Sequence, residues 1–176
     1  IISGLVGSEM CIRDRIFRLA KSGKLIEGIF RGETINTPSM LAVEDYLDTL
    51  KWAESIGGLS GLLGRVAENM GVLSAWVAGS DWAGFLCEDP ANLSTTSVCL
   101  KITDPDLVAQ EDPAQVSFAK RIAALLEGEG VAYDIGAYRD APAGLRIWAG
   151  ATVEAQDLAA LMPWLDWAYA TAKAKI

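Results

Sequence analysis

Residues 32–39 bring several hydrogen-bonding groups together where a helix is predicted to begin. Asn36 supplies an amide, Thr37 supplies a hydroxyl, and Pro38 suits the first position of a helix. The unpaired N–H groups and the positive dipole end of a helix N-terminus can bind a phosphate. The same residues could equally be a plain helix cap. From the residues alone, a phosphate site and a cap both remain open.

Two arginines, Arg139 and Arg146, flank a short turn that contains proline and glycine. If residues 145–149 form a strand, Arg146 and Trp148 point to one face and the apolar residues between them to the other. Guanidinium groups bind carboxylates and phosphates through paired hydrogen bonds. Two of them at one sheet edge could hold a small dianion. The alternative is that both are solvated and pair with the surplus acidic residues.

The composition is that of a globular protein and excludes several classes of function. The 176 residues are 51% hydrophobic and 22% charged, with a net charge of −8. This acidic balance argues against nucleic acid or an anionic membrane surface as the main partner. Every stretch without charge is much shorter than the roughly twenty residues that a membrane helix needs.

The chain has no histidine, which excludes histidine-based triads and most catalytic zinc sites. We therefore expect no metal site. The cysteines, Cys11, Cys87 and Cys99, are far apart and form no CxxC motif. This spacing favours a reducing cytoplasm over a disulfide framework.

Two amphipathic helices are predicted before any long strand, over residues 38–56 and 59–78. In the first, apolar residues recur three and four positions apart, which places them on one face. They are Met40, Val43, Leu47, Leu50 and Ala53. Glycine at positions 57 and 58 is typical of a helix end.

The rest of the chain alternates strands with helices. Short apolar or β-branched runs predict strands over residues 25–30, 95–103, 131–137 and 145–149. Asp112 and Gln115 have the spacing of a capping box and predict a helix that ends near Gly128. A last helix is predicted over 155–174. This order predicts an α+β fold, with helices on one face of a small, mostly antiparallel sheet.

Long segments of this chain resemble the phosphoserine aminotransferases, which are pyridoxal-phosphate enzymes of the fold-type I aminotransferase superfamily. The resemblance covers roughly residues 16–175 and is carried by KLIEGIF (24–30), GETINTPSM (32–40), VEDYL (43–47), TSVCLK (96–101), GVAYDIGAYRD (130–140) and GLRIWAGATVE (144–154). It matches the C-terminal part of that family. It therefore implies the small C-terminal domain of a fold-type I aminotransferase, preceded by part of the large-domain and interdomain helices.

The resemblance also assigns roles to single residues. It implies that Asn36 and Thr37 bind the cofactor phosphate of the neighbouring subunit, so that a homodimer shares its active site. Arg146 matches the arginine that binds the substrate α-carboxylate. Arg139 matches an arginine that binds the phosphate of phosphoserine or the distal carboxylate of glutamate. Tyr138 stands where the family more commonly has a histidine.

The implied reaction transfers the amine of glutamate to 3-phosphohydroxypyruvate, in the cytoplasm, with pyridoxal 5'-phosphate as cofactor. The substrates are small dianions. Two other hypotheses remain open from the sequence. One is another fold-type I aminotransferase, such as a serine–glyoxylate type. The other is a non-catalytic α+β module that binds an anion.

We expect three segments along the chain. Residues 1–15 resemble a non-native leader, 16–58 correspond to the end of a large cofactor domain and the start of a connecting helix, and 59–176 form the small domain. The Schiff-base lysine would lie upstream, so this chain alone is expected to be inactive. The apolar face that begins at Met40 should then be exposed.

Overall fold

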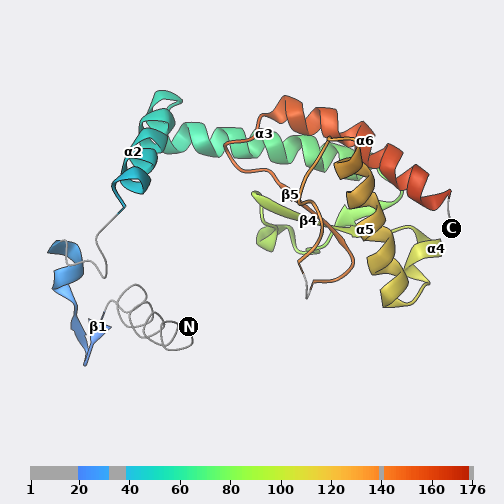
Figure 1. Cartoon of the computed structure of the whole chain (residues 1–176), viewed down its shortest axis with the longest axis horizontal. Coiled ribbons are helices and arrows are strands. Elements are labelled where there is room, and N and C mark those ends of the chain that lie inside the picture. Colours follow the sequence, from blue (N-terminus) through green and yellow to red (C-terminus); the bar gives the residue numbers. More distant parts are fainter. Residues whose placement is uncertain (1–19, 32–38, 139–140, 175–176) are drawn as a thin grey trace. The chain divides into compact units, whose positions relative to one another are not determined.

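The computed structural model describes residues 20–31, 39–138 and 141–174, and the chain divides into two compact units, residues 1–52 and 53–176 (Figure 1). In the first unit, β1 (Ala20–Lys21) pairs antiparallel with β2 (Lys24–Leu25). A 3-10 helix, η2 (Glu27–Arg31), follows. The strand predicted over 25–30 is therefore wrong beyond Leu25. Arg31 instead pairs with Glu27 at 2.6 Å, one turn earlier in the chain.

The predicted helix over 38–56 is confirmed as α2 (Met40–Ser55), but its cap is not where the sequence placed it. The first helical bond runs from the Val43 N–H to the Ser39 carbonyl, and the Ser39 hydroxyl accepts from the Ala42 N–H. Ser39 is thus the N-cap residue. Asn36 and Thr37, which the sequence offered as the cap, lie outside the described residues.

No residue of α2 is buried, which confirms the exposed apolar face. Met40 is 67% exposed and Tyr46 is 64% exposed. Val43, Leu47 and Leu50 are exposed as well. A row of large apolar side chains on one helix face indicates a surface that another part of a protein covers.

The second unit is a three-stranded antiparallel sheet with helices, which confirms the predicted α+β class. The strand order is β3 (Ala83–Phe85), β4 (Ser97–Ile102), β5 (Gly144–Trp148). Its helices are α3 (Gly58–Gly79), the short α4 (Pro105–Val108), α5 (Asp112–Gly128) and α6 (Ala155–Lys173). A 3-10 turn, η3 (Pro90–Asn92), lies between β3 and β4. Helix α6 packs against both α3 and α5 (Figure 1).

One face of the sheet is buried under these helices and the other is open. On β4 and β5, Val98, Leu100, Leu145 and Ile147 are all 2% exposed or less. Their neighbours on the other face are half-buried or exposed apart from Gly144, and Trp148 is 58% exposed. Because strand side chains alternate, this burial fixes which residues of β5 face outward. The predicted division of residues 145–149 between two faces is confirmed.

The edge strand β3 lies in a part of the chain where the sequence predicted no strand. Two expectations for this unit are wrong. Residues 131–137 form no strand, because the N–H groups of Val131 and Ala132 both return to the Leu126 carbonyl at the end of α5. The capping box at Asp112 is absent, since Glu111 precedes the helix and the Gln115 amide donates instead to the Gln110 carbonyl at 2.8 Å.

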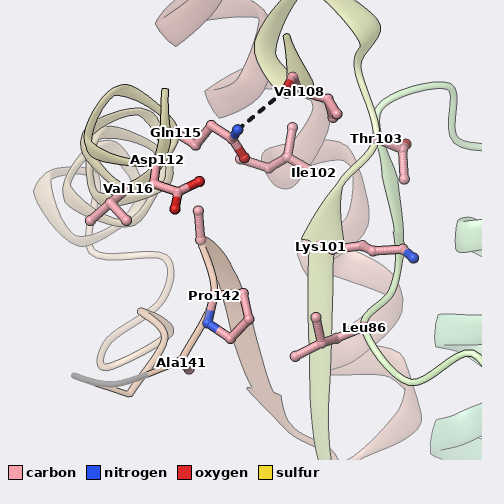
Figure 2. Close-up of a pocket in the computed structure, with 11 residues that line it drawn as sticks. Leu86, Lys101, Ile102, Thr103, Val108, Asp112, Gln115, Val116, Ala141 and Pro142 are labelled. Carbon is pink, nitrogen blue, oxygen red and sulfur yellow. Dashed lines mark hydrogen bonds between the residues drawn. The ribbon is translucent and has the colours of Figure 1, made fainter. Parts of the chain in front are cut away.

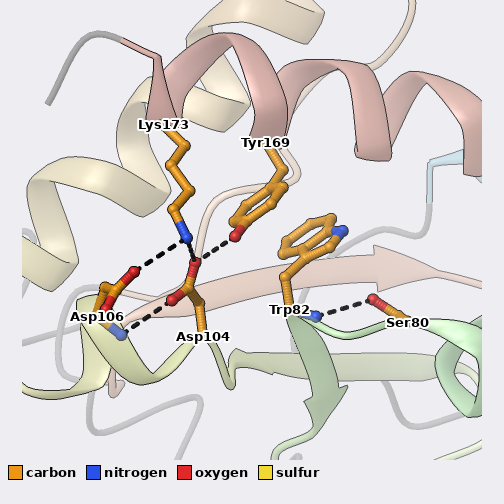
Figure 3. Close-up of polar contacts among 6 residues, drawn as sticks. All are labelled: Ser80, Trp82, Asp104, Asp106, Tyr169 and Lys173. Atoms are coloured by element: carbon orange, nitrogen blue, oxygen red, sulfur yellow. Dashed lines mark hydrogen bonds and ion pairs between the residues drawn. The ribbon is translucent and has the colours of Figure 1, made fainter.

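A buried carboxylate, Asp104, ties the end of α6 to the start of α4 (Figure 3). Its Oδ1 accepts from the Asp106 N–H, which caps α4. Its Oδ2 accepts from the Tyr169 hydroxyl and from Lys173. The hydrogen bonds from Lys173 and Tyr169 hold the pKa of Asp104 below its usual range. The Tyr169 ring stacks on Trp82, with centroids 4.5 Å apart, so the network is packed against the core.

We predict that Asp104 makes stability depend on acid pH. A depressed folded-state pKa means that its contribution is complete above about pH 4, the ordinary value for an unfolded aspartate, and is lost as the pH falls through the lower folded value. Asp104→Asn should lower the free energy of unfolding at neutral pH by about 1–3 kcal/mol and flatten its acid dependence. Urea unfolding followed by tryptophan fluorescence across this pH range measures both.

Asp81→Asn serves as the control, because Asp81 is exposed. It should leave the pH profile of the wild type unchanged. An Asp104→Asn profile that runs parallel to the wild type down to acid pH would contradict the assignment.

Candidate functional site

Arg146 lies on the open face of the sheet, in the middle of β5. It pairs with Cys99 of β4 in the antiparallel register, and its side chain is 20% exposed. The residues on either side, Leu145 and Ile147, are buried in the core. Because side chains alternate along β5, the Arg146 guanidinium lies on the open face while its two neighbours pack into the core on the other face.

Two side chains from the segment before β5 hold the Arg146 guanidinium. Its Nη2 donates to an Asp134 carboxylate oxygen at 2.8 Å and to the Asp134 carbonyl oxygen at 3.3 Å. Its Nη1 donates to the Tyr138 hydroxyl at 3.0 Å. The Tyr138 ring also lies against the guanidinium, with its centroid 4.3 Å from Cζ. These contacts give the group one defined orientation.

The same segment is fixed to β5 through its backbone. The Arg146 N–H donates to the Ile135 carbonyl at 2.8 Å, and Gly136 forms an isolated antiparallel bridge with Leu145. The approach of Asp134 and Tyr138 to Arg146 is thus set by main-chain pairing, with Ile135 buried beneath. The predicted strand over 131–137 is replaced by this single bridged contact.

The electrostatics of the site keep Arg146 charged. Partial burial acts to lower the pKa of Arg146, but the hydrogen bond and charge of Asp134 and the contact with Tyr138 outweigh it, and the pKa lies above its ordinary value. The Nε–H of Arg146 is buried and has no hydrogen-bond partner among the described residues. A buried N–H without an acceptor is uncommon in folded proteins.

The far end of β5 is held by two side chains of α3. The Asn69 side chain is 1% exposed, and its amide nitrogen donates to the carbonyls of Ala149, Gly150 and Val153 at 3.0–3.2 Å. One turn earlier, the Arg65 Nε donates to the Ala151 carbonyl at 2.6 Å. The turn that follows β5 is thus fastened to a helix, which fixes the strand that carries Arg146. Sequence periodicity assigned no role to Asn69, because an amide within an apolar helix carries no signal of its partner.

A larger, mostly apolar pocket of about 630 Å³ lies beside this site (Figure 2). Its walls are the start of α5, the end of β4 and the turn at residues 141–143. A smaller cleft includes Tyr138 and Arg146 and shares Pro142 with the large pocket. The guanidinium does not line the large pocket itself. The charged group that could bind an anion, Arg146, therefore lies in the smaller cleft and not in the large pocket.

The other site residues expected from the sequence, Arg139, Asn36 and Thr37, lie outside the described residues. Asp134 was not singled out by spacing. Its one signal is its type, because aspartate is among the few residues that tolerate a left-handed backbone in a turn. Cys87 and Cys99 are half-buried free thiols.

Within the described ranges, no group of three or more acidic or cysteine side chains is arranged to hold a metal ion. None of the helices in the same part of the chain has the length and apolar character needed to cross a membrane.

Two solved structures share this fold. The chain matches phosphoserine aminotransferase from Bacillus circulans subsp. alkalophilus with a TM-score of 0.65, at 19% identity, over 81% of this chain and 36% of that one. A phosphoserine aminotransferase studied for radiation damage of its Schiff base matches with a TM-score of 0.66, at 13% identity, over 86% and 39%. The fold of this chain is therefore similar to part of the fold of these two aminotransferase structures.

Curated proteins that are similar in sequence carry the same name as the two solved structures. The chain is 54% identical over 155 residues to the phosphoserine aminotransferases of Methanosarcina mazei and Methanosarcina barkeri, and 29% identical to that of a Nocardioides species. Over most of its length the chain is therefore similar to part of these phosphoserine aminotransferases. It spans about two fifths of the length of the two Methanosarcina proteins. No family model matches it.

We predict that Asn69→Leu destabilises the second unit. Leucine is close in size but cannot donate, so buried carbonyl groups after β5 lose their partner. The expected loss is about 1–3 kcal/mol in the free energy of unfolding, measured by denaturant titration. Glu68→Gln, at an exposed neighbouring position of α3, should change stability by less than about 0.5 kcal/mol. Equal effects of the two substitutions would contradict the role of Asn69.

Proposed function

We propose that this chain is part of a pyridoxal-phosphate-dependent phosphoserine aminotransferase, which transfers the amine of glutamate to 3-phosphohydroxypyruvate and forms phosphoserine and 2-oxoglutarate in serine biosynthesis. The observation that carries the proposal is the oriented Arg146 guanidinium on the open face of β5. It lies in a chain that is 54% identical to proteins named for this activity.

Arg146 supplies the group that binds the substrate α-carboxylate. It is charged at all physiological pH values, and its orientation is set before a ligand arrives. A guanidinium binds a carboxylate through parallel hydrogen bonds, which fixes the direction as well as the position of the substrate. Holding the carboxylate in one direction aligns the bond at the amine-bearing carbon for reaction.

Pyridoxal 5'-phosphate, when bound, supplies the electron sink that allows an amine to leave one acid and join another. Asn36 and Thr37 carry hydrogen-bonding groups of the type that a phosphate accepts from, and we propose that they bind the phosphate of this cofactor. Ser39 caps α2, so these two side chains are not needed for the cap. The Schiff-base lysine would come from sequence outside this chain.

The remaining parts of the proposal follow the same resemblance. Arg139 would bind the second anionic group, either the phosphate of phosphoserine or the distal carboxylate of glutamate. A homodimer would share each active site, and the exposed apolar face of α2 would be covered by the rest of the enzyme. The half-buried free thiols Cys87 and Cys99 fit a cytoplasmic enzyme.

We predict that Arg146→Lys in a complete enzyme that contains this chain lowers kcat/KM for glutamate by about 10- to 100-fold, because paired charged hydrogen bonds are lost. Arg121→Lys is the matched control, since Arg121 lies on α5 and contacts the Ala172 carbonyl. Steady-state kinetics of both variants test the assignment. Unchanged kinetics in a folded Arg146→Lys enzyme would remove Arg146 from carboxylate binding.

The substrate itself separates this proposal from a serine–glyoxylate type of aminotransferase. We expect kcat/KM for phosphoserine to exceed that for serine or alanine by about a thousandfold, because a site built to pair a polar group strongly rejects an analogue that lacks it. Coupled assays of 2-oxoglutarate consumption with each amino acid measure the ratio. Similar rates with serine or alanine would overturn the phosphoserine assignment.

A further inference from the structure

The segment that contacts Arg146 has an unusual backbone. Asp134 has a φ of +53°, in the left-handed region that residues other than glycine rarely adopt. Such a conformation costs free energy and persists where surrounding contacts fix it. At Asp134, the carbonyl and the carboxylate both accept from the same guanidinium nitrogen. The left-handed turn is what allows one residue to offer both oxygens to Arg146.

Tyr138 contacts the same guanidinium in two ways. Its ring covers one face of the guanidinium, and its hydroxyl accepts from Nη1 at the edge. Asp134 and Tyr138 therefore restrain both terminal nitrogens of Arg146. A guanidinium has five N–H groups, and these contacts use one of Nη1 and both of Nη2, which leaves the second N–H of Nη1 for a ligand.

These contacts add little to the stability of the fold. The Asp134 side chain is 90% exposed and Tyr138 is 62% exposed. Exposed ion pairs and exposed aromatic contacts contribute weakly to folding. They do restrict the rotamers of a long, flexible side chain. A ligand that binds an ordered arginine does not lose affinity to ordering it.

We propose that Asp134 and Tyr138 are positioning residues that pre-orient Arg146 for the substrate carboxylate. This inference rests on the proposed function and deepens it, because it names the residues that set the geometry of the carboxylate site. Neither residue touches the substrate. Both act through the guanidinium, so their effect on substrate binding requires an arginine at position 146.

The test is a double-mutant cycle in a complete enzyme that contains this chain. Asp134→Asn removes the charge and keeps the backbone carbonyl, and Tyr138→Phe keeps the ring and removes the hydroxyl. Each should raise KM for glutamate about five- to tenfold with kcat changed less than about threefold, since a preformed hydrogen-bonded geometry is lost. In an Arg146→Lys background, the same two substitutions should add no further increase.

Tyr133→Phe and Asp81→Asn are the matched controls, because both side chains are exposed and neither contacts Arg146. They should leave KM unchanged. An unchanged KM in Asp134→Asn and Tyr138→Phe overturns the proposal, and so does an equal increase in the Arg146→Lys background. A lower KM in Asp134→Asn would also overturn it, because Asp134 would then compete with the substrate for Arg146.

Titration calorimetry with 2-oxoglutarate provides a readout that does not depend on turnover. The expected result is the same fold-change in Kd for the two variants, again only when Arg146 is present. If the wild-type enzyme binds 2-oxoglutarate in this pattern but does not aminate 3-phosphohydroxypyruvate, the proposed function fails and the positioning role stands. If Arg146→Lys weakens binding and the two variants do not, the positioning role fails and the proposed function stands.

Discussion

The burial of alternate residues on β4 and β5 is the constraint on which the rest of the second unit depends. Val98, Leu100, Leu145 and Ile147 are covered by α3, α5 and α6, which leaves one face of a three-stranded sheet open. A strand register shifted by one residue would exchange the two faces. It would then bury the Arg146 guanidinium and expose the core. The position of the charge is thus set by the hydrophobic effect acting on its neighbours.

Two buried polar groups then fix the edges of this layer. Asn69 fastens the turn after β5 to α3, and Asp104 fastens the end of α6 to the start of α4. Each is nearly fully buried; the Asn69 amide nitrogen donates to backbone carbonyls, and both carboxylate oxygens of Asp104 accept hydrogen bonds. Such groups add specificity more than net stability, because their burial is offset by desolvation. Here Asn69 joins the turn after β5 to α3, and Asp104 joins the end of α6 to the start of α4.

The chain corresponds in length to part of the proteins that it resembles. Its similarity to phosphoserine aminotransferases covers about two fifths of their length, and the described residues contribute a charged group suited to a carboxylate. The exposed apolar face of α2 fits a surface that further polypeptide covers. Under the proposed function, a guanidinium whose orientation is already set locally favours substrate binding, because fewer groups must be ordered when the ligand binds.

The sequence by itself determined the helices α2, α3, α5 and α6, the strands β4 and β5, and the face of β5 that carries Arg146, because apolar periodicity is a local property of the chain. It also carried the family resemblance. Only the tertiary structure decided that residues 131–137 form a bridged loop, that β3 is the edge strand and that Asp134 and Tyr138 meet Arg146. These outcomes depend on which N–H groups bond the last carbonyls of α5 and on which segment lies beside β5. Both are decided by competition among distant hydrogen-bonding groups, which no local pattern records.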